Sequence, residues 1–197
     1  MKTLIRTILI FLSIVLILGV GVLIFFGLVF GTFDKHYTLN DLKVNFDLKR
    51  DEIFEAKNYF NSILPGDTKV DIEFESDKEL FYFNIIKDNS YYNVRDKSIN
   101  STEVDSLLNI LGWTVNNLTA LKDKLDEANC ISFDKDEDFK IGFQRSGMGK
   151  YYFRLLDKPM NDSTKLTINQ ECFYIYNDSI IFEYGGGALG NDCLEKE

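Results

Sequence analysis

The chain has 197 residues, with 31 acidic and 22 basic side chains, which gives a net charge of −9 at pH 7. Binding to nucleic acid needs clustered Lys and Arg side chains that neutralise phosphates, so this balance argues against a nucleic-acid partner. The excess of negative charge favours cationic partners, and it also serves solubility.

Residues 1–32 form the first predicted element. Lys2 and Arg6 precede an apolar run from residue 8 to residue 31, in which Ser13 is the only polar side chain. As a helix this run would be about 36 Å long, against about 30 Å for the apolar core of a bilayer. The run is longer than the core of a secretory signal peptide, and no small-residue cleavage site follows it. We therefore predict an uncleaved transmembrane signal anchor over residues 1–32.

Basic residues before a span favour a cytoplasmic N-terminus. This rule predicts a single-pass protein of the cell membrane in which residues 33–197 form one extracytoplasmic domain, periplasmic or extracellular. Gly19, Gly27 and Gly31 share one helix face, and Gly27-x-x-x-Gly31 matches the small-x-x-x-small packing pattern. This face would either pack against a second copy or a partner helix, or merely reflect the abundance of glycine in membrane helices.

The first half of the domain mixes strands and helices. Residues 37–46 alternate loosely and predict a connecting strand, whereas apolar residues at helical spacing predict a helix over residues 50–64. Strict alternation of apolar and polar residues then predicts a strand over residues 70–75. A nearly continuous run of apolar and aromatic residues predicts another over residues 80–86.

Two further helices follow. A capping box over residues 100–103 predicts a helix that Gly112 ends, and Thr114 begins a second helix that ends at Asn129. The two helices would meet at a corner formed by Gly112 and Trp113.

The final third predicts only strands and hairpin turns, at about residues 130–134, 139–145, 150–157, 172–177 and 179–184. Helices followed by a run of strands indicate an α+β domain. We expect a mostly antiparallel sheet of five to seven strands with about three helices packed on one face.

The three cysteines are Cys130, Cys172 and Cys193. In an oxidising compartment we expect one disulfide and one free thiol. The sequence does not fix the pairing; we favour Cys172–Cys193 because it encloses the shortest loop. No two cysteines have zinc-ligand spacing and His36 is the only histidine, so we predict no metal site.

Two further motifs do not fulfil their patterns. Residues 185–190 fit G-x-G-x-x-G, but only seven residues follow, too few for the helix and strand of a dinucleotide site. Residues 134–138 begin like a calcium loop, yet Phe139 and Arg145 occupy the positions that require Gly and Glu. We therefore predict no cofactor.

Catalytic groups are also hard to find. Asp71, Glu73 and Glu75 share one strand face, but like charges on an open face ordinarily stay ionised and hydrated. A serine nucleophile would need His36 as its base. The hairpin from Arg145 to Lys150 could present cations and backbone amides to an anionic ligand, or could be a plain turn. We predict no catalytic residue.

Aromatic residues are abundant in the predicted strands, and alternation sends about half of them outward. We predict that Tyr82, Tyr152, Tyr174 and Tyr176 form an exposed interaction surface, because tyrosine buries a large area and keeps a polar tip. The alternative is that helices cover this face.

Together these features predict a membrane-anchored extracytoplasmic interaction or accessory module. It would sit in the bilayer and bind another envelope protein through its span and its sheet surface. The alternative is a membrane-tethered hydrolase or carbohydrate-processing enzyme that uses paired carboxylates.

Overall fold

The computed structural model describes residues 2–29, 35–147, 149–162, 165, 173–185 and 194. The helices are α1 (Lys2–Val29), α2 (Leu39–Leu48), α3 (Arg50–Ile63), α4 (Thr102–Leu111) and α5 (Val115–Glu127). The strands are β1 (Thr68–Ser76), β2 (Glu79–Lys87), β3 (Ser90–Ser98), β4 (Ser132–Lys135), β5 (Phe139–Ser146), β6 (Gly149–Leu155), β7 (Phe173–Asn177) and β8 (Ile180–Gly185).

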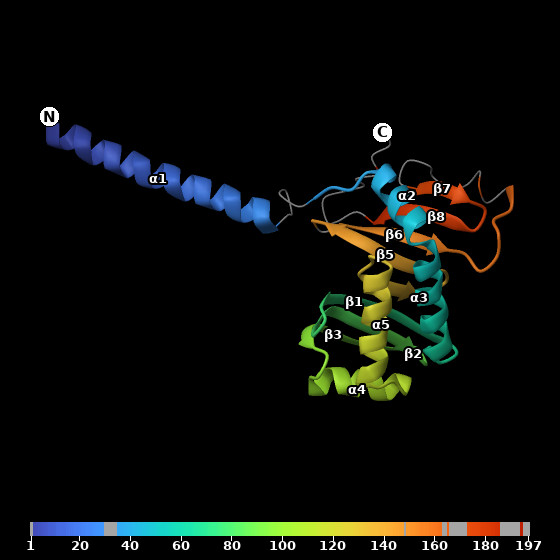
Figure 1. Ribbon diagram of the computed structural model, residues 1–197. Coiled ribbons are helices and arrows are strands. Elements are labelled where there is room, and N and C mark those ends of the chain that lie inside the picture. The colour runs from blue at the N-terminus through green and yellow to red at the C-terminus, as the bar shows by residue number, and fades with distance from the viewer. Residues whose placement is uncertain are drawn as a thin grey trace.

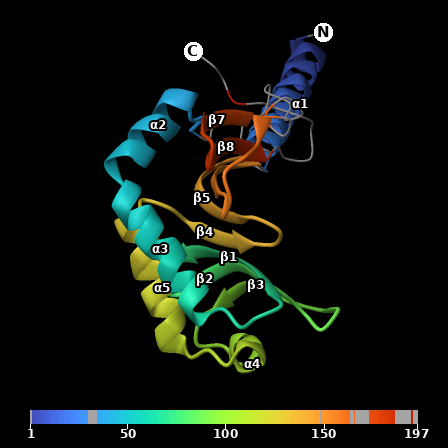
Figure 2. The ribbon, with the colours of Figure 1, turned by 90° about the vertical axis from the view of Figure 1, so that its right-hand side faces the viewer.

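The strands form one sheet in the order β3-β2-β1-β4-β5-β6-β8-β7, with every neighbouring pair antiparallel. The sheet is bent along this order, and α2, α3 and α5 lie along one of its faces while α4 lies near the β3 edge (Figures 1 and 2). The α+β class, the antiparallel sheet and the one-sided helix layer are as predicted.

The core lies between this helix layer and the sheet. Opposing residues of successive strands line up there in an apolar row of Phe83, Ile72, Phe133, Ile141, Phe153 and Phe182. All six are at most 1% exposed. Phe60 of α3 stacks on Phe133, with 4.9 Å between the ring centroids, and thereby joins the two layers.

The number of strands is a correction, because the sheet has eight strands rather than five to seven. The strand that the sequence does not reveal is β3, whose side chains are largely exposed. An edge strand has one partner and here packs little apolar surface, so it lacks the alternation by which the other strands are recognised.

The helix count also exceeds the prediction, because residues 39–48 form α2 instead of a connecting strand. Leu39, Leu42 and Phe46 are buried on one stripe of this helix. A capping box fixes its start: the Thr38 hydroxyl accepts from Asp41 N at 3.2 Å, and the Asp41 carboxylate accepts from Thr38 N at 2.8 Å.

The helix α1 covers most of the predicted anchor and projects away from the sheet domain (Figure 1). Within the described residues, however, no helix meets the length and hydropathy needed to cross a membrane. This finding contradicts the predicted transmembrane signal anchor.

The predicted helix-packing face of α1 is described only in part. Gly19 is exposed, with no atom within 4 Å of the position that a Cβ would take, and Gly27 is half-buried. Gly31 lies outside the described residues.

No disulfide is present in the described part of the chain. Cys130 is a buried free thiol, and burial raises its pKa. Cys172 and Cys193 lie outside the described residues.

Candidate functional site

The sheet face opposite the helix layer is here called the open face, and no described helix covers it (Figure 2). Directly opposed residues form two polar rows across the strands. The Glu73 row consists of Tyr82, Glu73, Ser132, Gly142, Tyr152 and Glu183. The Asp71 row consists of Asn93, Asn84, Asp71, Asp134, Lys140 and Arg154.

Glu73 lies at the centre of its row and is only 2% exposed. Arg145 approaches both of its carboxylate oxygens, with Nη2 donating to Oε2 at 2.9 Å and Nε donating to Oε1. Lys150 Nζ also donates to Oε2, at 2.8 Å. A buried carboxylate is tolerated only with such charge and hydrogen-bond partners. Two cations therefore compensate Glu73 in full.

Lys150 is itself buried, and its ammonium group has no capacity left for a ligand. Besides Glu73, it donates to Tyr82 OH at 2.6 Å and to Ser132 Oγ at 2.9 Å, which uses its three protons. The Arg145–Lys150 hairpin was one candidate for binding an external anion. In the structure, its two cations hold the protein's own carboxylate.

Gly142 makes room for this arrangement. A Cβ at this position would lie 2.0 Å from Ser132 Oγ and 3.1 Å from Lys150 Cδ. The side chains of Ser132 and Lys150 thus occupy the space above the glycine.

Glu183, at the other end of the Glu73 row, also forms ion pairs with two cations, although its Oε2 makes no hydrogen bond to another described residue. Lys140 Nζ and Arg154 Nη2 each lie 2.7 Å from one of its carboxylate oxygens. Tyr152 lies between the two compensated acids, with Lys150 Nζ 4.8 Å and Lys140 Nζ 5.5 Å from its ring centroid. Tyr152 therefore belongs to an internal network of charges.

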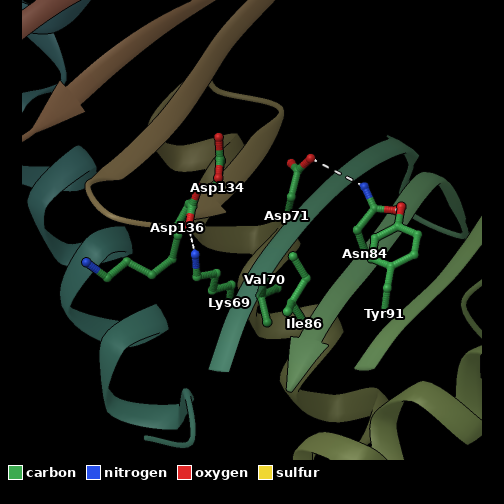
Figure 3. A pocket seen from close by; sticks show the side chains of 9 residues that line it. Lys69, Val70, Asp71, Asn84, Ile86, Tyr91, Asp134 and Asp136 are labelled. Carbon is green, nitrogen blue, oxygen red and sulfur yellow. Dashed lines mark hydrogen bonds and ion pairs between the residues drawn. The ribbon is translucent and has the colours of Figure 1, made fainter. Parts of the chain in front are cut away.

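The Asp71 row is different, because it borders a cavity of about 220 Å³ (Figure 3). Asp71 and Asp134 are directly opposed on β1 and β4. Strands β1 to β4 and the turn after β4 supply the lining: Lys69, Val70, Asp71, Asn84, Ile86, Tyr91, Asp134, Lys135 and Asp136.

A chain of hydrogen bonds orients Asp71 in this cavity. Tyr91 OH donates to Asn84 Oδ1 at 3.1 Å, and Asn84 Nδ2 donates to Asp71 Oδ2 at 3.4 Å (Figure 3). The other oxygen, Asp71 Oδ1, is buried and has no hydrogen-bond partner among the described residues. A buried acceptor without a partner is costly and rare.

The charge of the cavity follows from which carboxylates are paired. Asp136 forms an ion pair with Lys69, whereas Asp134 has no hydrogen bond or ion pair to another described residue. Burial raises the pKa of Asp71. Burial, and next to it the charge of Asp71, raises the pKa of Asp134 to about 6. Asp71 and Asp134 thus face each other without forming an ion pair to another described residue, although the charges of Lys140 and Lys150 partly offset the rise in their pKa values.

A larger hollow of about 530 Å³ lies between α2 and β5. Its only lining carboxylate is Asp41, which is engaged in the capping box of α2. In the part of the chain that is described, no group of three or more His, Cys, Asp or Glu side chains could hold a metal ion.

The four tyrosines of the predicted interaction surface fall on opposite faces of the sheet. Tyr82 and Tyr152 are half-buried on the open face. Tyr174 and Tyr176 lie on the helix side, where Tyr176 stacks on Phe182 and donates to Asp47. The structure therefore does not bring the four together.

The carboxylates of β1 are also less hydrated than expected. Glu75 is exposed, but Glu73 is buried and Asp71 is half-buried. The sequence gives Asp71 and Glu73 one face, as alternation requires, but it does not reveal Asp134, Asn84 and Tyr91 as neighbours of Asp71. The polar positions of β2 were the only sequence signal that pointed to these neighbours, and such positions carry no information on which strands pair.

His36 does meet a serine in the structure. Ser146 Oγ and His36 Nδ1 are 3.0 Å apart, and Tyr37 N donates to Tyr151 OH at 3.2 Å. Ser146 is only 3% exposed. These contacts fasten the segment before α2 to the β5–β6 hairpin.

Comparisons with protein-family models, with curated proteins and with solved structures find no match.

Proposed function

We propose that this protein is an interaction module that binds a protein partner through the open face of its sheet, at the β2–β3 end. The observation that carries the proposal is the exposed pair Ile86 and Tyr91 beside the Asp71 cavity. These residues are directly opposed on β2 and β3, and 42% and 59% of their surfaces are exposed. An aromatic anchor beside a cavity is typical of the centre of a protein interface.

The charge of the protein favours a basic partner. The chain carries a net charge of −9, and the cavity contributes Asp71 and Asp134, which form no ion pair with another described residue. Complementary charge accelerates the encounter with a basic surface and selects against acidic ones.

Site-specific photo-crosslinking in the cells that produce the protein tests this proposal. A photoreactive phenylalanine analogue replaces Tyr91 in one variant, and exposed Asp123 of α5 on the helix side in a matched control. We expect one protein adduct from position 91, its loss when Ile86→Lys is added, and no adduct from position 123. No adduct from position 91, or the same adduct from both positions, would overturn the proposal.

A hydrolase that uses paired carboxylates is the second candidate. Asp71 and Asp134 are directly opposed and both have a raised pKa. A general acid needs such a pKa, and carboxylates about 5–9 Å apart serve glycoside hydrolysis. The cavity of about 220 Å³ is smaller than most ligand sites, which span roughly 300–1,000 Å³, so we place binding first.

A direct assay separates the two candidates. The purified protein is incubated with a panel of nitrophenyl glycosides, alongside Asp134→Asn and the exposed-acid control Glu75→Gln. Release of nitrophenol that only Asp134→Asn abolishes would favour the enzyme. Absence of release from every substrate would count against it.

A further inference from the structure

We propose that the cavity around Asp71 and Asp134 binds the guanidinium group of an arginine side chain. The inference rests on the proposed function, because the protein partner supplies the arginine. It names the chemical group that the open face recognises.

The first step is the free acceptor. Tyr91 fixes Asn84, and Asn84 donates its amide to Asp71 Oδ2, so the carboxylate is held in one orientation. Its second oxygen, Oδ1, remains buried without a partner in the described part of the chain. What is missing at this oxygen is a hydrogen-bond donor.

The second step is charge. Lys69 neutralises Asp136, and Lys135 lies 3.6 Å from Asp157. Asp71 and Asp134 form no ion pair with another described residue and lie opposite each other, and two ionised carboxylates at such positions are an unfavourable cross-strand pair. The donor that suits this site is therefore a cation that reaches both carboxylates.

The third step is shape. A guanidinium group is a planar fork with five donors, which can bridge two carboxylates and stack on an aromatic ring. Tyr91 provides an exposed ring at the cavity wall, while Ile86 provides apolar surface. A lysine ammonium group is a compact point charge without a plane, so it fits the two opposed acids and the ring less well.

Titrations of the full-length protein with three small amides, followed by NMR, test this inference. The probes are N-acetyl-arginine amide, N-acetyl-lysine amide and N-acetyl-citrulline amide, the last being a neutral analogue of arginine with nearly the same shape. We expect saturable binding of the arginine amide and at least about tenfold weaker binding of the other two.

Three variants locate the binding. We expect Asp71→Asn and Asp134→Asn each to weaken binding of the arginine amide about tenfold, which corresponds to the loss of one charge-assisted contact. Glu75→Gln removes an exposed acid of the same strand and should leave the affinity unchanged. Thermal unfolding of each variant confirms that it is folded.

The inference fails if the arginine amide shows no saturable binding, if lysine binds as well as arginine, or if Asp71→Asn binds as tightly as the unaltered protein. The crosslinking and binding experiments together separate failure of this inference from failure of the proposed function. Crosslinking from position 91 without arginine binding would retain the function and reject the guanidinium site. Arginine binding without crosslinking would retain the site and reject the function.

Discussion

Glu73 and Asp71 lie two residues apart on β1 and face the same side of the sheet, yet their surroundings differ. Glu73 is held by Arg145 and Lys150, and all of its charge is compensated within the protein. Asp71 has a buried oxygen without a partner, and its cross-strand neighbour is another acid, Asp134. A compensated acid is part of the structure, whereas an uncompensated acid marks a place where a ligand can supply what is missing.

The position of the β5–β6 hairpin causes this difference. The bulge between Gly142 and Arg145 shifts the register of β5 against β6, and Arg145 and Lys150 from the end of this hairpin reach Glu73. They form no ion pair with Asp71. Glu183 shows the same principle as Glu73, since Lys140 and Arg154 compensate it.

Removal of Lys150, one of the two cations beside Glu73, should cause the largest loss of stability. Lys150→Met deletes one of the two cations at a carboxylate that is 2% exposed, and leaves Tyr82 and Ser132 without their donor. We expect a loss of about 3–5 kcal/mol in the free energy of unfolding, measured in urea at pH 7. Lys97→Met removes an exposed lysine on β3 and should change little. Equal effects of the two variants would refute the view that Lys150 is structural.

A methyl group at Gly142 should act on the same network by crowding it. Gly142→Ala places a Cβ 2.0 Å from Ser132 Oγ, so we expect a destabilisation of about 1–3 kcal/mol. Gly66→Ala is the matched control, because no atom lies within 4 Å of its Cβ position. Removal of the clashing oxygen in Ser132→Ala/Gly142→Ala should recover part of the lost stability. A double variant no more stable than Gly142→Ala would contradict the clash.

Substitution of Asp71 should stabilise the protein, in contrast to the substitutions around Glu73. In Asp71→Asn a neutral amide faces Asp134 and can donate to it, so the repulsion between two carboxylates disappears. We expect the free energy of unfolding at pH 7 to rise by about 0.5–1 kcal/mol, even though binding of the arginine amide is weakened. Glu75→Gln on the same strand should leave the stability nearly unchanged. A destabilised Asp71→Asn variant would show that Asp71 is structural after all.

The smallest expected effect is on how the free energy of unfolding depends on pH, and it concerns Asp134, the cross-strand neighbour of Asp71. Burial and the charge of Asp71 raise the pKa of Asp134 to about 6 in the folded state, above the ordinary value of 3.8 for an aspartate. Between these values the folded state binds more protons than the unfolded state, so this carboxyl favours folding as the pH falls from about 7 to about 4. Asp134→Asn should therefore be more stable than the unaltered protein at pH 7 and lose that advantage near pH 4. An advantage independent of pH in urea unfolding would contradict the raised pKa.

Particular residues show what could be predicted locally. Strict alternation over residues 70–75 correctly indicates β1 and its two faces, and Gly112, with φ of 70°, ends α4 as predicted. The strand predicted over residues 37–46 is wrong, because the apolar spacing there fits loose alternation as well as a helical stripe. The capping box at Thr38 and Asp41 was the overlooked signal for a helix.

The sequence by itself determined the α+β class, most strands and helices, and the shared face of Asp71 and Glu73, because these follow from short-range periodicity. Only the tertiary structure decided which acid receives a cation. Arg145 and Lys150 lie more than 70 positions from Glu73 along the chain, and Asp134 lies more than 60 from Asp71. A period of two residues fixes the face of a side chain but not its partner strand, so charge compensation became visible only once the register was known.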